Sequence, residues 1–157
     1  MLQMISHGVN IVGLFFCYEI IVRRTKTGEI ASLGGIASKA PIFAAFFMII
    51  LLGSISLPLT NSFIGEFLLL LGVFEYNVYL AAVAGLTIIL GAVYMLWMYQ
   101  RTMYGEVTEA TAGFTDLTRQ EMAVLVPIVV IILWIGIYPH MFLGLAEPAV
   151  KSILMIP

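Results

Sequence analysis

Charged residues are scarce in this 157-residue sequence. They make up 10% of the chain, whereas hydrophobic residues make up 62% and the mean hydropathy is +1.09. A soluble domain has about 25% charged residues, so this chain has too few charges to keep its apolar surface in water. Disorder requires low hydrophobicity, and nucleic-acid binding requires a basic face. The composition excludes these classes and predicts a protein whose solvent is the lipid bilayer.

Residues that bind metals or form disulfides are also few. The chain has one cysteine, Cys17, and two histidines, so it cannot form an internal disulfide or a Cys/His cluster for zinc, iron–sulfur or haem. It has no glycine-rich phosphate loop and no Ser, His and acid set within aqueous reach. We therefore predict no redox centre, no metal site and no cofactor in this chain itself.

Four apolar stretches contain most of the hydrophobic residues. A helix needs about 20 residues to cross a hydrocarbon core of about 30 Å, and the stretches are long enough for this. Membrane β-strands would instead show short segments of alternating apolar and polar residues, which are missing here. The predicted fold class is all-α, a polytopic transmembrane helix bundle with four spans at about 1–22, 40–74, 78–99 and 120–143.

The second stretch is too long for one simple helix. Residues 40–74 would form a rod of about 50 Å at 1.5 Å per residue. Pro58 lies in its middle, among serine, threonine and asparagine residues that can satisfy freed backbone groups. We therefore predict a helix broken at Pro58, with halves from Pro41 to about Ser56 and from about Ser62 to Phe74. Irregular backbone at membrane depth indicates an ion or substrate path, because it must be covered by protein or water.

Basic residues predict the orientation of the spans. The segments 23–39 and 100–119 hold six of the seven lysines and arginines, and loops rich in these residues remain in the cytoplasm. Both chain ends are therefore predicted on the outer side, with a short surface helix over 147–157. The fourth span should begin with a capping box, Thr118 to Glu121, and stop near Tyr138 and Pro139.

Glu66 is the strongest candidate functional residue. It lies in the second half of the broken helix, about 13 Å of helix before the span ends near Glu75. A carboxyl group at this depth is costly, so it usually faces the bundle interior and serves a function. The alternative is a protonated glutamic acid that donates one hydrogen bond between helices.

A polar stripe on the first span holds His7. Gln3, His7 and Asn10 lie within about 60° of one another on a helix, with Ser6 and Cys17 at the flanks. An imidazole can relay a proton near neutral pH, but a neutral histidine can also simply bond across a helix interface. We expect Gln3 and Asn10 to support such a path.

The remaining acids are predicted to be structural or solvated. Glu19 should pair with Arg23, four residues later on the same helix. The others lie in connections or at ends and are expected to be solvated charges: Glu29, Glu75, Glu106, Glu109, Asp116 and Glu147.

Four runs of residues carry a resemblance to a known family. They read LQMISHG, PLTNSFIGEFLLL, GAVYMLWMYQRTMYG and DLTRQEMAVLVPIVVIILWIGIYP. In this order and at these distances they resemble the C-terminal part of the antiporter-like M subunits of bacterial proton-pumping NADH:quinone oxidoreductase, respiratory complex I. The resemblance implies a larger helix bundle of two inverted repeats, each with one broken helix, and both ends on the periplasmic side.

The resemblance also implies roles for individual residues and partners. Glu66 matches the acid of the second broken helix, His7 matches a histidine that links a central lysine to the exit, and Pro58 matches the break. The implied partners are the missing N-terminal part of the subunit, other membrane-arm subunits and the lipids of the bacterial plasma membrane. FMN, iron–sulfur clusters and quinone are expected in partner subunits, and no nucleic acid is expected.

The leading hypothesis is therefore proton translocation through intramembrane ionisable residues, driven by quinone reduction elsewhere. A second hypothesis is a subunit of a multisubunit cation/proton antiporter or of a membrane-bound hydrogenase, which share the broken helix and the acid. A third is an inert structural segment whose ionisable groups only pack.

Overall fold

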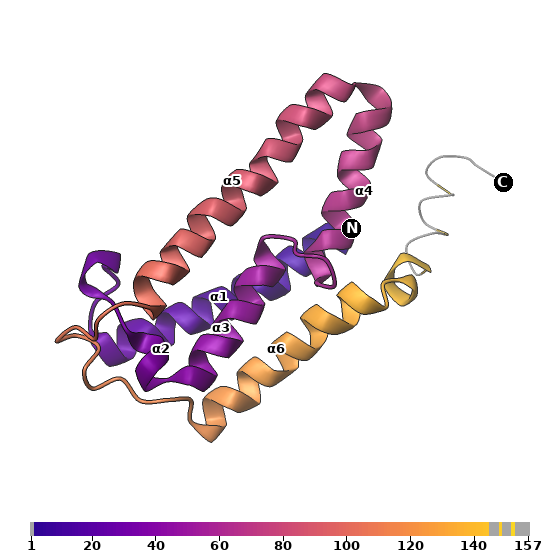
Figure 1. Cartoon of the computed structure of the whole chain (residues 1–157). Coiled ribbons are helices and arrows are strands. Elements are labelled where there is room, and N and C mark those ends of the chain that lie inside the picture. The colour runs from indigo at the N-terminus through magenta and orange to yellow at the C-terminus, as the bar shows by residue number, and fades with distance from the viewer. Residues whose placement is uncertain (1, 145–147, 149–151, 153–157) are drawn as a thin grey trace.

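Every regular element of the described chain is a helix, and the fold class is confirmed (Figure 1). The computed structural model describes residues 2–144, 148 and 152, so most of the surface helix predicted over 147–157 lies outside the described residues. The elements are α1 (Leu2–Thr25), η1 (Ile30–Ser32), α2 (Ile36–Lys39), α3 (Pro41–Ser54), α4 (Asn61–Tyr76), α5 (Val78–Met103) and α6 (Arg119–Ile137).

Three of these helices are long and apolar enough to cross a membrane, namely α1, α5 and α6. The stretch predicted as the second span is divided between α3 and α4, neither of which belongs to this group of long helices. The predicted fourth span, 120–143, is longer than α6. The helix ends at Ile137, Tyr138 leaves the helical conformation, and a separate helical segment at 140–144 follows Pro139.

The predicted break is present at Pro58. Helix α3 ends at Ser54 and α4 begins at Asn61, with residues 55–60 forming a link. Two residues of the link, Ser56 and Leu59, have positive φ angles of 58° and 76°, which lie outside the α-helical range. Proline cannot donate a hydrogen bond and clashes with a continuing helix, which explains why the helix stops there.

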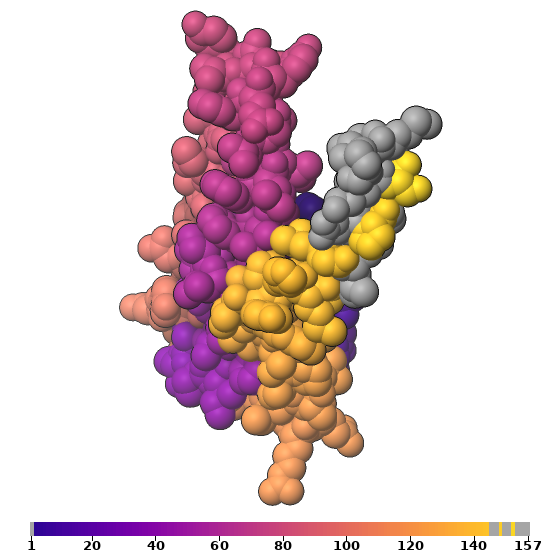
Figure 2. Space-filling view, turned by 90° about the vertical axis from the view of Figure 1, so that its right-hand side faces the viewer, coloured from indigo at the N-terminus to yellow at the C-terminus, as the bar shows by residue number. Residues whose placement is uncertain are grey.

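The hydrophobic core lies where α1, α3 and α6 pack together. Its largest fully buried side chains include Phe43 and Ile50 on α3, Ile20 on α1, and Leu125 and Ile132 on α6. Helix α5 differs, because no residue of its most apolar window is buried. Figures 1 and 2 show why: α4 and the first half of α5 form a hairpin that extends beyond the ends of α1 and α6.

Two connections between the helices are joined by hydrogen bonds at the end opposite the α4–α5 hairpin. The Thr108 hydroxyl donates to the Ser32 carbonyl at 2.8 Å, and the Thr111 hydroxyl donates to the Gly34 carbonyl at 2.7 Å. The sequence placed these two connections on one side of the membrane from their basic residues. These hydrogen bonds hold the connection between α1 and α3 against the connection between α5 and α6.

Helix α6 contacts the link through Gly136. A Cβ atom at this position would overlap the carbonyl oxygen of Leu59. Backbone atoms of the link cannot move aside as a flexible side chain could. Only glycine therefore allows α6 to cover the break so closely.

We expect Gly136→Ala to destabilise the chain by about 1 to 3 kcal/mol, the usual cost of overpacking. The matched control is Gly85→Ala on α5, where a Cβ atom would meet nothing within 4 Å. Thermal unfolding in detergent, followed by circular dichroism, measures both. Equal unfolding midpoints for the two variants would contradict the close contact between α6 and the link.

Candidate functional site

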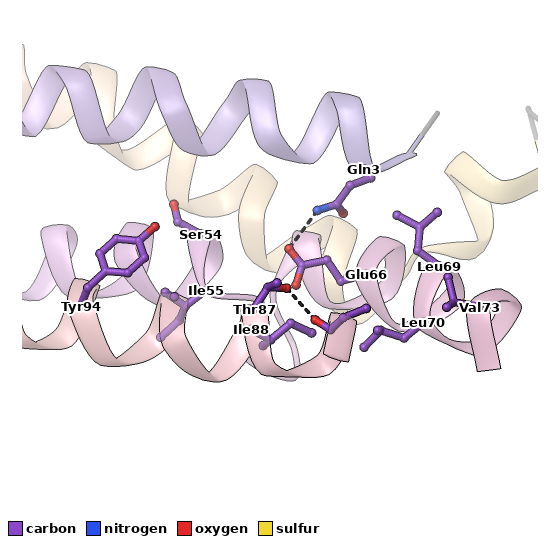
Figure 3. Close-up of a pocket in the computed structure, with 12 residues that line it drawn as sticks. Gln3, Ser54, Ile55, Glu66, Leu69, Leu70, Val73, Thr87, Ile88 and Tyr94 are labelled. Atoms are coloured by element: carbon purple, nitrogen blue, oxygen red, sulfur yellow. Dashed lines mark hydrogen bonds between the residues drawn. The ribbon is translucent and has the colours of Figure 1, made fainter. Parts of the chain in front are cut away.

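Glu66 lines a cavity between α4 and α5 (Figure 3). The cavity has a volume of about 440 Å³, and its polar lining residues come from four helices: Gln3 of α1, Ser54 of α3, Glu66 of α4, and Thr87 and Tyr94 of α5. Glu66 is partly buried and lies in the second turn of α4, directly after the link. The break in the helix therefore places a carboxyl group beside a cavity that other helices supply with polar groups.

The amide of Gln3 contacts this carboxyl group. Gln3 Nε2 donates to Glu66 Oε1 at 3.1 Å, across the interface between α1 and α4. Two hydroxyl groups of the cavity are engaged elsewhere, since Thr87 donates to the Ala84 carbonyl and Ser54 donates to the Ile50 carbonyl. Figure 3 shows the Tyr94 hydroxyl pointing toward Ser54. Within the described chain, Gln3 is the residue that hydrogen-bonds Glu66.

A set of buried amide and hydroxyl groups joins α1 to the start of α4. The Ser6 hydroxyl donates to the Asn61 carbonyl at 3.1 Å, and the Asn61 amide donates back to the Ser6 carbonyl at 3.2 Å. One turn further along α1, the Asn10 amide donates to the Ser62 hydroxyl at 2.8 Å. We call Ser6, Asn10, Asn61 and Ser62 the α1–α4 clasp. Because all four residues are buried, these bonds fix the first turn of α4 against α1.

Three buried polar atoms near the break have no hydrogen-bond partner in the described structure. They are Gln3 Oε1, Asn10 Oδ1 and Ser56 Oγ. A buried polar atom without a partner costs about 1 to 3 kcal/mol, so such atoms are favourable sites for ordered water. The surroundings of the break are therefore polar in character although the helices around them are apolar.

The structure divides the predicted polar stripe on α1. Gln3 and Asn10 bond residues of α4 as described, but the His7 side chain is exposed, whereas Ser6 and Asn10 are buried. Glu66 and His7 are thus not brought together by this chain. Sequence reasoning placed Ser6 at the flank of the stripe. It counted Asn61 and Ser62 only among the residues that satisfy backbone groups at the break and did not predict their bonds to α1.

A second polar cluster joins the C-terminal end of α1 to the start of α6. The Glu121 carboxylate, 5% exposed, forms ion pairs with Arg23 and with Arg24, the latter at 2.6 Å. Arg24 also donates to the Thr115 carbonyl at 2.8 Å. The predicted capping box is present as well, since Thr118 and Glu121 bond each other at the start of α6. Sequence reasoning recognised Glu121 only as a cap and missed its two arginine partners.

Two predictions about acidic residues near this cluster have different outcomes. The pairing of Glu19 with Arg23 is confirmed at 3.7 Å, with both side chains about half exposed. The prediction that Asp116 is a solvated charge is wrong. Its carboxylate accepts from the backbone N–H groups of Ile42 and Phe43 at 3.0 and 2.9 Å, and so caps the start of α3. A capping residue far away in sequence leaves no local signal.

The family model for the NADH:quinone oxidoreductase/Mrp antiporter transmembrane region matches residues 1–91. The chain belongs to this family. The matched part includes α1, the broken helix with Glu66 and the first part of α5, whereas Tyr94 of the cavity lies just beyond it. Together with the long apolar helices, membership indicates a multi-pass membrane protein.

Named relatives are similar over nearly the whole chain. The NADH-quinone oxidoreductase subunit M of Rickettsia typhi is 46% identical over 98% of this chain, and NADH-ubiquinone oxidoreductase chain 4 of Marchantia polymorpha is 40% identical over 98%. A chain of respiratory complex I from Thermus thermophilus has a similar structure, with a TM-score of 0.84 and 35% identity over 89% of this chain. The chain spans about a third of these relatives, 31% of each subunit and 29% of the solved chain.

We expect Glu121→Gln to destabilise the chain by about 3 kcal/mol, because it leaves two arginines without their buried carboxylate. Glu19→Gln is the matched control, since it removes an exposed partner of the same Arg23 and should cost less than about 1 kcal/mol. Thermal unfolding in detergent compares the two variants. A similar loss for both would show that burial of the Glu121 pair does not matter.

Proposed function

We propose that this chain forms part of a proton-translocating membrane subunit of an NADH:quinone oxidoreductase, with Glu66 as a group that takes up and releases the proton. The observation that carries the proposal is the position of Glu66 on the wall of a partly polar cavity beside a broken helix. The names of the relatives support the enzyme class.

The contacts of Glu66 suit a group that changes its protonation state. Its hydrogen-bond partner is the neutral amide of Gln3, whereas Glu121 is paired with Arg23 and Arg24. A carboxylate held by two cations is strongly stabilised in its charged form and does not readily take up a proton. A carboxyl group held by one amide can exist in both forms. We therefore assign a structural role to Glu121 and the proton-exchanging role to Glu66.

His7 is proposed to relay protons to or from this site. Its exposed side chain cannot face lipid at low cost, since an ionisable group in hydrocarbon normally faces protein or water. We propose that the missing N-terminal part of the subunit covers this face of α1 and carries the central lysine. The three buried polar atoms near the break that have no partner among the described residues would bind the water that links His7 to Glu66.

We assign the redox groups and the driving force to partner subunits. FMN, iron–sulfur clusters and quinone belong to other subunits, and quinone reduction there supplies the driving force. Other membrane-arm subunits and the lipid bilayer surround the chain. In the proposed orientation, the connections joined by Thr108 and Thr111 lie in the cytoplasm of a bacterial plasma membrane, and both chain ends lie on the periplasmic side.

The alternative function is that of a subunit in a multisubunit cation/proton antiporter, for which the family description leaves room. A membrane-bound hydrogenase subunit and an inert structural segment are the other candidates. The oxidoreductase is favoured because the relatives cited above, similar over 98% of the chain, carry that name.

We expect Glu66→Gln in the full-length subunit to lower NADH-driven proton uptake by membrane vesicles at least tenfold. The amide keeps the size of the side chain but cannot bind and release a proton. The control is Glu75→Gln, at an exposed position near the end of the same helix, which should leave uptake unchanged. Assembly of the complex is checked on native gels. Normal uptake by an assembled Glu66→Gln enzyme would remove Glu66 from the mechanism.

The relay role predicts that His7→Leu also lowers proton uptake, whereas Tyr18→Phe, on another exposed position of α1, does not. The reason is that leucine cannot bind a proton, while phenylalanine keeps the bulk of tyrosine. The same vesicle measurement applies. Unchanged uptake in an assembled His7→Leu enzyme would indicate that His7 serves packing alone.

A further inference from the structure

We propose that Gln3 is a positioning residue that holds Glu66 in both of its protonation states, by turning its side-chain amide. This inference rests on the proposed function, because it assumes that Glu66 binds and releases a proton. It goes further in assigning the residue that keeps the carboxyl group in place between those two events.

The first argument is the hydrogen-bonding capacity of the two groups. An ionised carboxylate only accepts hydrogen bonds, whereas a protonated carboxyl group also donates one. The Gln3 amide donates through Nε2 at 3.1 Å, which matches the ionised form. Its oxygen can accept from the protonated form. No proton leaves Glu66 in this exchange, since only the direction of the contact between the two side chains is reversed.

The second argument is that the oxygen of this amide is free to take that role. Gln3 Oε1 is buried and has no hydrogen-bond partner among the described residues. An amide that was bonded at both ends would have to break a second bond in order to turn. A half-turn about the last side-chain bond exchanges the oxygen and nitrogen, which are nearly equal in size. The amide can therefore reverse without repacking of its neighbours.

The third argument is the space that Gly65 provides. A Cβ atom at this position would overlap Gln3 Oε1 and would lie 3.2 Å from the Gln3 Cα atom. Glycine beside the reactive carboxyl group thus lets α1 approach α4 closely enough for the amide to reach Glu66. A larger residue would push the amide out of reach.

The other polar groups around Glu66 do not hydrogen-bond its carboxyl group. In the cavity, the hydroxyls of Ser54 and Thr87 donate to carbonyls of their own helices. Tyr94 on α5 is the other titratable residue of the cavity lining, and its hydroxyl points toward Ser54 (Figure 3). His7, one turn from Gln3 on α1, is exposed. Within the described chain, Gln3 is therefore the residue that we assign to bond both protonation states of Glu66.

The test measures NADH-driven proton uptake by vesicles containing the full assembled enzyme, from pH 6 to pH 9. Gln3→Met keeps the length of the side chain but removes both the donor and the acceptor. We expect uptake to fall about tenfold, as for loss of a hydrogen bond to a charged group, and by a similar factor at every pH, since both states of Glu66 lose their partner. Tyr18→Phe, at an exposed position of α1 that does not line the Glu66 cavity, should have little effect.

A second pair of variants separates hydrogen bonding from packing. Gly65→Ala should lower uptake as Gln3→Met does, because it displaces the amide. The double variant Gly65→Ala with Gln3→Gly removes the close contacts with both Oε1 and Cβ of residue 3 but lacks the amide, so it should remain defective. Recovery of uptake in the double variant would overturn the proposal in favour of simple packing.

The pH profile distinguishes the remaining outcomes. The pH profile of uptake by Gln3→Met could instead shift to higher pH and keep the maximum of the unaltered enzyme. This result would mean that Gln3 contacts only the ionised form of Glu66, and it would overturn the proposed contact with both forms. Normal uptake by Gln3→Met together with loss in Glu66→Gln would overturn this inference and leave the proposed function intact. Normal uptake in both would instead remove the proposed function.

Discussion

The structure depends on the hydrogen bonds between α1 and the start of α4. A helix broken in an apolar environment exposes backbone groups that nothing apolar can satisfy, and each costs free energy. At the break, Asn61 Oδ1 accepts from the Ser62 N–H group at 2.9 Å. The α1–α4 clasp holds Asn61 and Ser62 in place with side chains of a neighbouring helix. It also fixes the first turn of α4, and thereby the direction in which Glu66 points, one turn further along. Without the clasp, the same sequence would place a carboxyl group on a half-helix with no defined orientation.

Ion pairs and neutral polar contacts lie in different parts of the structure. At one end, Arg23, Arg24 and Glu121 balance one another and tie α1 to α6, and Asp116 caps α3. Near the break, neutral amides and hydroxyls surround the single partly buried carboxyl group. Strong pairing gives rigidity because it favours one charge state. The hydrogen-bond partner of Glu66 is instead the neutral amide of Gln3.

Much of the fold could be predicted because its causes are local. The length of the apolar stretch at 40–74 and the chemistry of proline led directly to a break at Pro58, which the structure contains. The capping box at Thr118 follows from residues three apart in the sequence. The end of α6 was placed correctly near Tyr138 and Pro139, although the span predicted around it ran further. The predicted stripe on α1 failed in part, because helical geometry gives the angle between two side chains but not which side a neighbour covers.

The sequence by itself determined that this chain is a set of apolar helices, that one of them is interrupted, and that an acid lies just beyond the interruption. These properties follow from composition, length and the missing N–H group of proline. Only the tertiary structure decided which groups meet: Gln3 with Glu66, Asn10 with Ser62, and two arginines with Glu121. These contacts join residues dozens of positions apart. They depend on how the helices pack side by side, and no local pattern of residues specifies that arrangement.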